Sequence, residues 1–136
     1  MIRPYVDTDY EEVKINLEDG NLFDPEMDTR EIIKNKIKKD SKSILVAEIN
    51  KKIIGNVYVV NDPWFAAIFR LAVKREYRGK NIGLSLMQKA EQYLKNQGHS
   101  QVMLFANQNF DKLIGWYKKQ GYKHSDNTFK ALWKQL

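Results

Sequence analysis

The strongest constraint on the fold is a series of three apolar segments joined by very short turns. The segments run from Ser43 to Ile49, from Ile53 to Val60 and from Phe65 to Val73, and β-branched residues dominate them. The turns between them read "NKK" and "NDP". Connections this short join only antiparallel neighbours, so the sequence predicts a three-stranded antiparallel meander.

Helical periodicity precedes the meander. After a short strand at the N-terminus, Tyr10, Val13 and Leu17 recur at the spacing of one helix face, which predicts a first helix. In "DTREIIKNKIKKD", Asp28 and Glu31 have the form of a capping box, which predicts a second, strongly basic helix.

The chain returns to helical spacing after the meander, from Ile82 to a stop at Gly98, and then to a strand-like run from Gln101 to Ala106. A strand, a helix and a strand in this order make a right-handed parallel crossover. A last helix ending at Gly121 and a terminal strand in "TFKALWKQL" complete the pattern. We therefore expect one α+β domain over residues 1–136: a mixed, mostly antiparallel sheet with helices on both faces and a strand-helix-strand parallel crossover.

Composition narrows the classes of function. The chain has 136 residues and no cysteine, which excludes disulfides, thiolate nucleophiles and zinc-thiolate sites, and no metal site is expected. The formal charge of +6 favours an anionic ligand. No apolar run is long enough to span a membrane, and the acids soon after Met1 are unlike a signal peptide, so we expect a cytoplasmic protein without a membrane partner.

A basic, glycine-containing turn joins the third strand to the following helix, in "KREYRGKNIG". The unpaired N–H groups at a helix N-terminus bind anions, and Arg78 and Lys80 add positive charge there. Gly79 and Gly83 leave room for close backbone approach, so the turn favours a phosphate-bearing ligand. The alternative is an exposed basic turn with no ligand, since short motifs also occur by chance.

The stretch "LAVKREYRGKNIGLSLMQKAEQYLKNQG" resembles the acetyl-CoA-binding signature [QR]-x-x-G-x-[GA] of the GNAT N-acetyltransferases, and "WYKKQGY" resembles a second stretch of that family. The element order matches over nearly the whole chain. The resemblance implies that acetyl-CoA is the acetyl donor and that the backbone of Leu71 and Val73 pairs with its pantetheine arm. Its pyrophosphate would bind to Arg78, Gly79, Lys80, Asn81, Ile82 and Gly83.

One residue departs from the signature, because Asn81 stands where the family has its first glycine. Asparagine is the residue other than glycine that most readily adopts a positive φ, so we expect the loop to keep its shape.

The resemblance also implies that Tyr117 gives a proton to the departing CoA thiolate. The alternative is a core tyrosine, since Tyr117 shares a helix face with Leu113 and Ile114. Asn109, or its neighbour Asn107, would contact pantetheine.

No general base is evident in the sequence. The strand before the signature carries Arg70 and no acid, and the nearest acids of the meander are Glu48 and Asp62. A chain of water molecules that accepts the proton is an equal alternative.

The acceptor is indicated only by an acidic loop from Leu17 to Asp28, which favours a small cationic amine or a protein amino group. The alternative is that these acids cap a helix and solvate the loop. Without cysteine, we expect direct attack by the amine in a ternary complex.

A catalytically silent acyl-CoA sensor is the competing function. Nucleic-acid binding by "KNKIKKDSK" is disfavoured because no aromatic residues are interleaved. Homodimers are common in the family, so a homodimer is one possible assembly.

Overall fold

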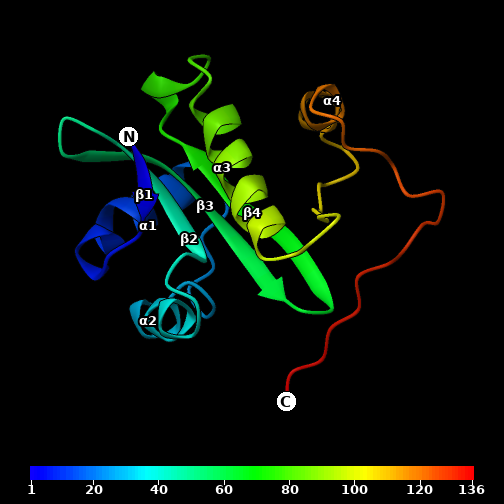
Figure 1. The fold of residues 1–136 in the computed structure, drawn as a ribbon, viewed down its shortest axis with the longest axis horizontal. Coiled ribbons are helices and arrows are strands. Elements are labelled where there is room, and N and C mark those ends of the chain that lie inside the picture. Colours follow the sequence, from blue (N-terminus) through cyan, green and yellow to red (C-terminus); the bar gives the residue numbers. More distant parts are fainter. The chain divides into compact units, whose positions relative to one another are not determined.

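The computed structural model describes all 136 residues, which form two compact units, residues 1–104 and 105–136. The first unit holds the sheet and three of the α-helices, and the second holds the last helix (Figure 1).

The sheet has four strands in the order β1-β2-β3-β4, and every neighbouring pair is antiparallel. The strands are β1 (Ile2–Pro4), β2 (Ile44–Ile49), β3 (Lys52–Asp62) and β4 (Phe65–Val73). The predicted meander is confirmed. Its β2–β3 turn consists of Asn50 and Lys51, with φ values of 49° and 64°, which is the left-handed pair that matches the twist of a two-residue hairpin.

Three α-helices accompany the sheet: α1 (Tyr10–Asp19), α2 (Arg30–Lys39) and α3 (Ile82–Asn96). Two short 3-10 turns, η1 (Asp7–Asp9) and η2 (Arg75–Tyr77), precede α1 and α3. The predicted capping box of α2 is wrong by one residue, because the Thr29 hydroxyl, not Asp28, accepts the Ile32 N–H at 3.3 Å. Asp28 is instead buried.

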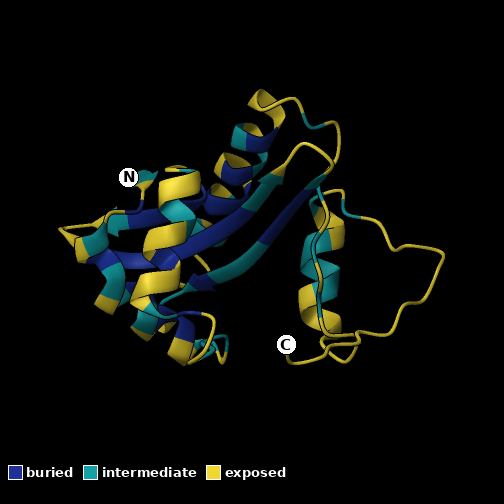
Figure 2. Ribbon diagram, turned by 90° about the horizontal axis from the view of Figure 1, so that it is seen from below, coloured by how far each residue is buried: buried dark blue, intermediate teal, exposed yellow.

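Helices cover both faces of the sheet, as predicted (Figure 1). On one face, Val13 and Leu17 of α1 and Ile33 of α2 pack in a single core with strand residues. Alternate strand residues point to the other face, where α3 contacts β2, β3 and β4 and buries its own apolar side. That buried side consists of Leu86, Met87, Ala90 and Leu94. Figure 2 shows the result, in which the central strands are buried almost throughout.

The strand predicted from Gln101 to Ala106 is almost absent. The chain after α3 makes a single parallel bridge, in which Met103 O accepts the Ile68 N–H and Met103 N donates to Ala66 O, each at 3.0 Å. The crossover therefore returns parallel to β4, but pairing stops there. A parallel strand needs cover on both faces, and Met103 is 49% exposed.

In the second unit, α4 (Asp111–Lys119) forms as predicted and is followed by Gly121 at φ 95°. The terminal strand predicted in "TFKALWKQL" is wrong, because residues 123–136 have no regular secondary structure. Phe129 and Trp133 of this segment are exposed.

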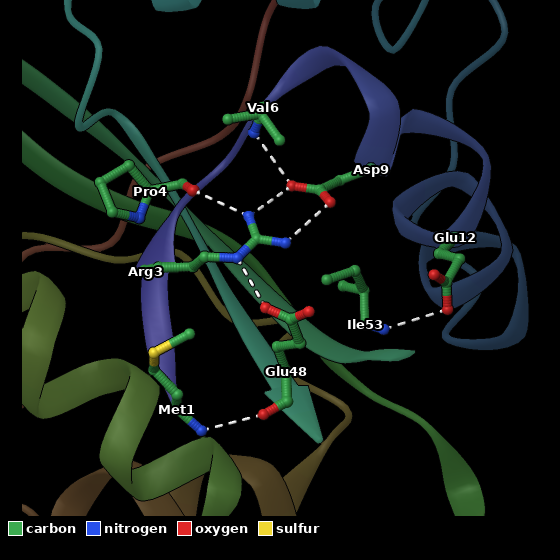
Figure 3. Close-up of polar contacts among 8 residues, drawn as sticks. All are labelled: Met1, Arg3, Pro4, Val6, Asp9, Glu12, Glu48 and Ile53. Carbon is green, nitrogen blue, oxygen red and sulfur yellow. Dashed lines mark hydrogen bonds and ion pairs between the residues drawn. The ribbon is translucent and has the colours of Figure 1, made fainter. Parts of the chain in front are cut away.

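A polar network, here called the edge network, holds the N-terminus to β2 (Figure 3). Arg3 donates from both terminal nitrogens to Asp9, at 2.8 and 3.0 Å, and from Nε to Glu48 at 2.7 Å. The amino group of Met1 donates to Glu48 O at 2.9 Å. Because β1 is so short, these side-chain and terminal bonds add to the few backbone hydrogen bonds that pair it with β2.

None of the helices has both the length and the apolar character required to cross a membrane.

Candidate functional site

The basic turn between β4 and α3 has the backbone shape that the sequence predicted. Gly79 has φ 75° and Asn81 has φ 62°, so both residues are left-handed. Asn81 is the N-cap of α3, and its side chain makes no capping hydrogen bond. The first N–H groups of α3 have no acceptor within the helix, so they remain available to a ligand.

Positive charge gathers at the same turn. Arg75, Arg78 and Lys80 are exposed, and the Lys80 ammonium lies 5.5 Å from the centre of the Tyr77 ring. Together with the positive end of the α3 dipole, these cations make the turn a site for an anion.

Two contacts fix the base of the turn to the sheet. Lys74 Nζ pairs with Glu12 Oε2 of α1 at 3.4 Å. The same oxygen accepts the Ile53 N–H at 3.0 Å, which Figure 3 shows. The turn is therefore held to both α1 and β3.

Gly55 of β3 lets α3 approach the sheet closely. A Cβ atom at this position would lie 3.0 Å from Ala72 O and 3.1 Å from Leu86 Cδ1. Gly55 is not among the residues predicted from the sequence, although a glycine inside a strand is a known signal of close approach.

The edge of β4 is irregular where the resemblance puts pantetheine. Arg70 and Leu71 together lie opposite Val57 of β3, which makes a β-bulge, and Arg70 has φ 54°. Lys74 N donates to Ile54 O of β3, so the carbonyl of Val73 in the same peptide points away from β3. This carbonyl accepts Arg78 Nε at 2.8 Å.

The loop predicted from Leu17 to Asp28 begins later, because Leu17–Asp19 belong to α1, and three of the acids in this stretch have partners within the protein. Asp28 pairs with Arg70, at 3.2 Å from Nη2 and 3.3 Å from Nε, and Asp24 accepts the N–H groups of Glu26 and Met27. Those two backbone bonds lower the pKa of Asp24. Glu18 lies 3.8 Å from Lys14. The loop keeps its negative charge, but Asp28 has its counter-ion in β4.

Tyr117 and Asn109 belong to the second unit. Tyr117 lies among aromatic rings in α4, 5.1 Å from Trp116 and 5.7 Å from Tyr122 between ring centres. Burial raises the pKa of the Tyr117 phenol, so the hydroxyl keeps its proton at neutral pH. The side chain of Asn107 accepts the Asn109 N–H at 2.9 Å, so Asn107 is engaged in its own turn. The roles of Tyr117 and Asn109 stay predictions.

The acids considered as bases have other partners. Glu48 pairs with Arg3, and Asp62 accepts the Trp64 N–H at 2.9 Å. A hollow of about 320 Å³ lies at the end of β3 remote from the turn and is lined by Asn61, Pro63, Gln97, Gly98 and His99. There His99 Nε2 lies 2.8 Å from Asn61 Oδ1. None of these groups lies at the basic turn.

Comparison with known proteins agrees with the geometry. The family model described as Acetyltransferase (GNAT) family matches residues 9–122. Among solved structures, Ard1 from Thermoplasma volcanium superposes with a TM-score of 0.81 at 21% identity, over 92% of this chain and 83% of that one.

Two further structures share the fold. The PaiA N-acetyltransferase from Thermoplasma acidophilum in complex with coenzyme A has a TM-score of 0.76 at 22% identity, over 94% of this chain and 92% of that one. Glucosamine-6-phosphate N-acetyltransferase from Arabidopsis thaliana has a TM-score of 0.71 at 18% identity, over 98% of both chains.

Proposed function

Because the chain belongs to the acetyltransferase (GNAT) family, we propose that it transfers an acetyl group from acetyl-CoA to an amino group of a small cationic amine or of a protein, by direct attack in a ternary complex. The observation that carries this proposal is the turn between β4 and α3. Its left-handed Gly79 and Asn81 turn the chain so that unpaired N–H groups and cations face one exposed anion site. A diphosphate has the charge and the acceptor oxygens to use both.

The pyrophosphate site consists of the turn and the start of α3: Arg78, Gly79, Lys80, Asn81, Ile82 and Gly83. Arg78 also links this site to β4, because its Nε donates to Val73 O at 2.8 Å. A diphosphate would draw the Arg78 guanidinium away, since a charge-assisted bond is stronger than a bond to a carbonyl. Val73 O would then be free to accept an amide N–H of pantetheine.

Leu71 contributes at the reacting thioester. Arg70 O points toward β3 and accepts a hydrogen bond from the side chain of Asn56 in that strand. The N–H of Leu71 in the same trans peptide therefore points away from β3. β4 is the last strand of the sheet on that side. There the Leu71 N–H would donate to the thioester carbonyl oxygen and stabilise the negative charge that develops on it.

The remaining chemistry is a proton balance. The acceptor nitrogen bonds to the acetyl carbon, the carbon–sulfur bond breaks, and the nitrogen loses a proton to water. Tyr117, which keeps its proton at neutral pH, would supply the proton that the CoA thiolate needs. Asn109 would bind pantetheine. The acids Glu18, Asp19, Asp24 and Glu26 favour a cationic acceptor.

The test is release of free CoA thiol from acetyl-CoA in the presence of a panel of amines, including polyamines, aminoglycosides and basic peptides. The proposal expects release with at least one acceptor and a marked loss in Arg78→Gln. The matched control is Lys42→Gln, which removes a positive charge before β2, far from the turn in the sequence.

One observation favours a second function, a catalytically silent acyl-CoA sensor. The family commonly has a carboxylate on this strand, whereas β4 carries Arg70 and no acid. Tight CoA binding without thiol release on any acceptor would favour the sensor. Absence of CoA binding would contradict both functions. A cytoplasmic location and a homodimer stay predictions from the sequence.

A further inference from the structure

Two buried side-chain amides, one in β3 and one in α1, stabilise the β-bulge in β4. Asn56 of β3 is 0% exposed and donates from Nδ2 to Arg70 O at 2.9 Å. Its Oδ1 accepts Asn16 Nδ2 of α1 at 3.2 Å, and Asn16 is 1% exposed. These three groups, Asn16, Asn56 and the Arg70 carbonyl, are here called the bulge network.

This network is costly for a merely structural feature. Asn16 and Asn56 lie on the sheet face that carries the apolar core of α1, where buried amides need partners to offset their desolvation. Even so, Asn16 Oδ1 has no partner. Arg70 adds the strain of a left-handed backbone at a residue other than glycine.

What the network determines is the orientation of one peptide. The Arg70 carbonyl is held toward Asn56, so the Leu71 N–H in the same plane points the opposite way. The Arg70 side chain is fixed as well, by Asp28, which is 4% exposed and also accepts the Asp24 N–H at 2.8 Å. The peptide has little freedom to rotate.

We propose that Asn56, supported by Asn16, is a positioning residue for acetyl transfer: it holds the Arg70–Leu71 peptide so that the Leu71 N–H donates to the thioester carbonyl. Asn56 touches neither substrate and acts through that peptide. The inference rests on the proposed function. A bond prepared in advance costs no reorganisation as charge develops, which is when it contributes most.

The test is Asn56→Ala, with the affinities for CoA and acetyl-CoA and the value of kcat measured on the folded protein. CoA lacks the acetyl carbonyl, so its Kd should stay within about threefold, whereas acetyl-CoA should bind about three- to tenfold more weakly relative to CoA. We expect kcat to fall about 10- to 100-fold, because a transition-state donor is misplaced. A structural role alone would lower the melting temperature without changing the ratio of the two affinities.

The matched control is Tyr58→Phe, which removes a buried hydroxyl from the same face of β3; this hydroxyl makes no hydrogen bond, so the change takes no bond from the Arg70–Leu71 peptide. It should leave both affinities and kcat unchanged. If Asn56→Ala does not fold, Asn16→Ala is the variant that tests the proposal. It keeps the Asn56 bond to Arg70 O but removes the bond from Asn16 that holds the Asn56 side chain, so kcat should fall about three- to tenfold.

The proposal is overturned if a folded Asn56→Ala protein keeps kcat within twofold of the wild type, or if it loses CoA and acetyl-CoA affinity equally. The ratio of affinities does not depend on turnover. A wild type that binds both molecules but acetylates nothing would therefore contradict the proposed enzyme and still leave this inference open to measurement.

Discussion

The first unit contains two polar networks, and they differ in what they hold. The edge network ties β1 to η1 and β2 through charged groups, and its Arg3 side chain is 25% exposed. The bulge network lies under β4, consists of neutral amides and is almost fully buried. Charges at a sheet edge stabilise the pairing of a short strand, whereas buried amides at a bulge orient one peptide. Variants should therefore separate stability from catalysis.

The largest expected effect is on stability, from Arg3→Met. The change leaves Asp9 buried without its counter-ion, so we expect the free energy of unfolding to fall by about 2 to 3 kcal/mol. Urea unfolding measures it, with Lys14→Met as control, because the exposed Lys14–Glu18 pair should contribute less than about 0.5 kcal/mol. The folded fraction of Arg3→Met should keep its kcat. A large loss of kcat would show that the edge network also affects catalysis.

The edge network should also make stability depend on pH. Burial opposes ionisation of Asp9, but hydrogen bonds from Arg3 and from the Val6 N–H outweigh it and hold the pKa of Asp9 below its usual value. The unfolded state then binds the proton first as the pH falls. The free energy of unfolding should decrease from about pH 5 downward. Arg3→Met should flatten this dependence in urea titrations at several pH values, and an equally steep dependence in the variant would contradict the assignment.

An intermediate effect is expected from Arg70→Gly, which acts at the bulge on both strain and charge. Glycine relieves the strain of the left-handed backbone, which should raise the free energy of unfolding by about 1 kcal/mol. The buried Asp28 loses its counter-ion, which should lower the free energy of unfolding by about 2 to 3 kcal/mol. The net result should be destabilisation by about 1 to 2 kcal/mol in urea unfolding. A more stable variant would show that the Asp28 pair contributes little.

Lys51→Gly isolates the strain alone. Lys51 has φ 64° in the β2–β3 turn and makes no ion pair, so glycine should stabilise the protein by about 1 kcal/mol. Thermal unfolding measures the change, and kcat should not move. Destabilisation would show that the Lys51 side chain has a role in the turn beyond its backbone.

The smallest effect is expected from Asn81→Gly. The residue is already left-handed and its side chain does not cap α3, so glycine restores the family pattern without changing the loop. The Kd for CoA, measured by calorimetry, should stay within about threefold of the wild-type value. A collapse of binding would mean that the Asn81 amide itself contacts the ligand.

Short-range patterns made most of the fold predictable. The turns at Asn50 and after Asp62 leave only antiparallel pairing, and the periodicity of α1, α2 and α3 is strong. The shape of the basic turn followed from Gly79 and from the tolerance of Asn81 for positive φ. Each of these features depends on residues close together in the chain.

The features that escaped prediction depend on distant partners. Nothing near Arg70 in the sequence signals a left-handed bulge, because Asn56 and Asp28 stabilise it from β3 and from the loop before α2. For the same reason the local sequence pattern wrongly predicts Asp28 as a helix cap, because its partner Arg70 lies in β4. The strand predicted around Met103 has the composition of a strand but lacks cover on both faces.

Whether the turn binds the pyrophosphate and the Leu71 N–H binds the thioester is tested most directly by an amide NMR titration. The ¹⁵N-labelled protein is titrated with CoA and then with acetyl-CoA. Both ligands should shift the amides of Gly79, Ile82 and Gly83, because both carry the pyrophosphate, and only acetyl-CoA should shift the Leu71 amide further, as its N–H meets the thioester carbonyl. Unchanged turn amides with either ligand would contradict the pyrophosphate site, and a Leu71 amide that responds identically to both ligands would contradict its bond to the thioester carbonyl.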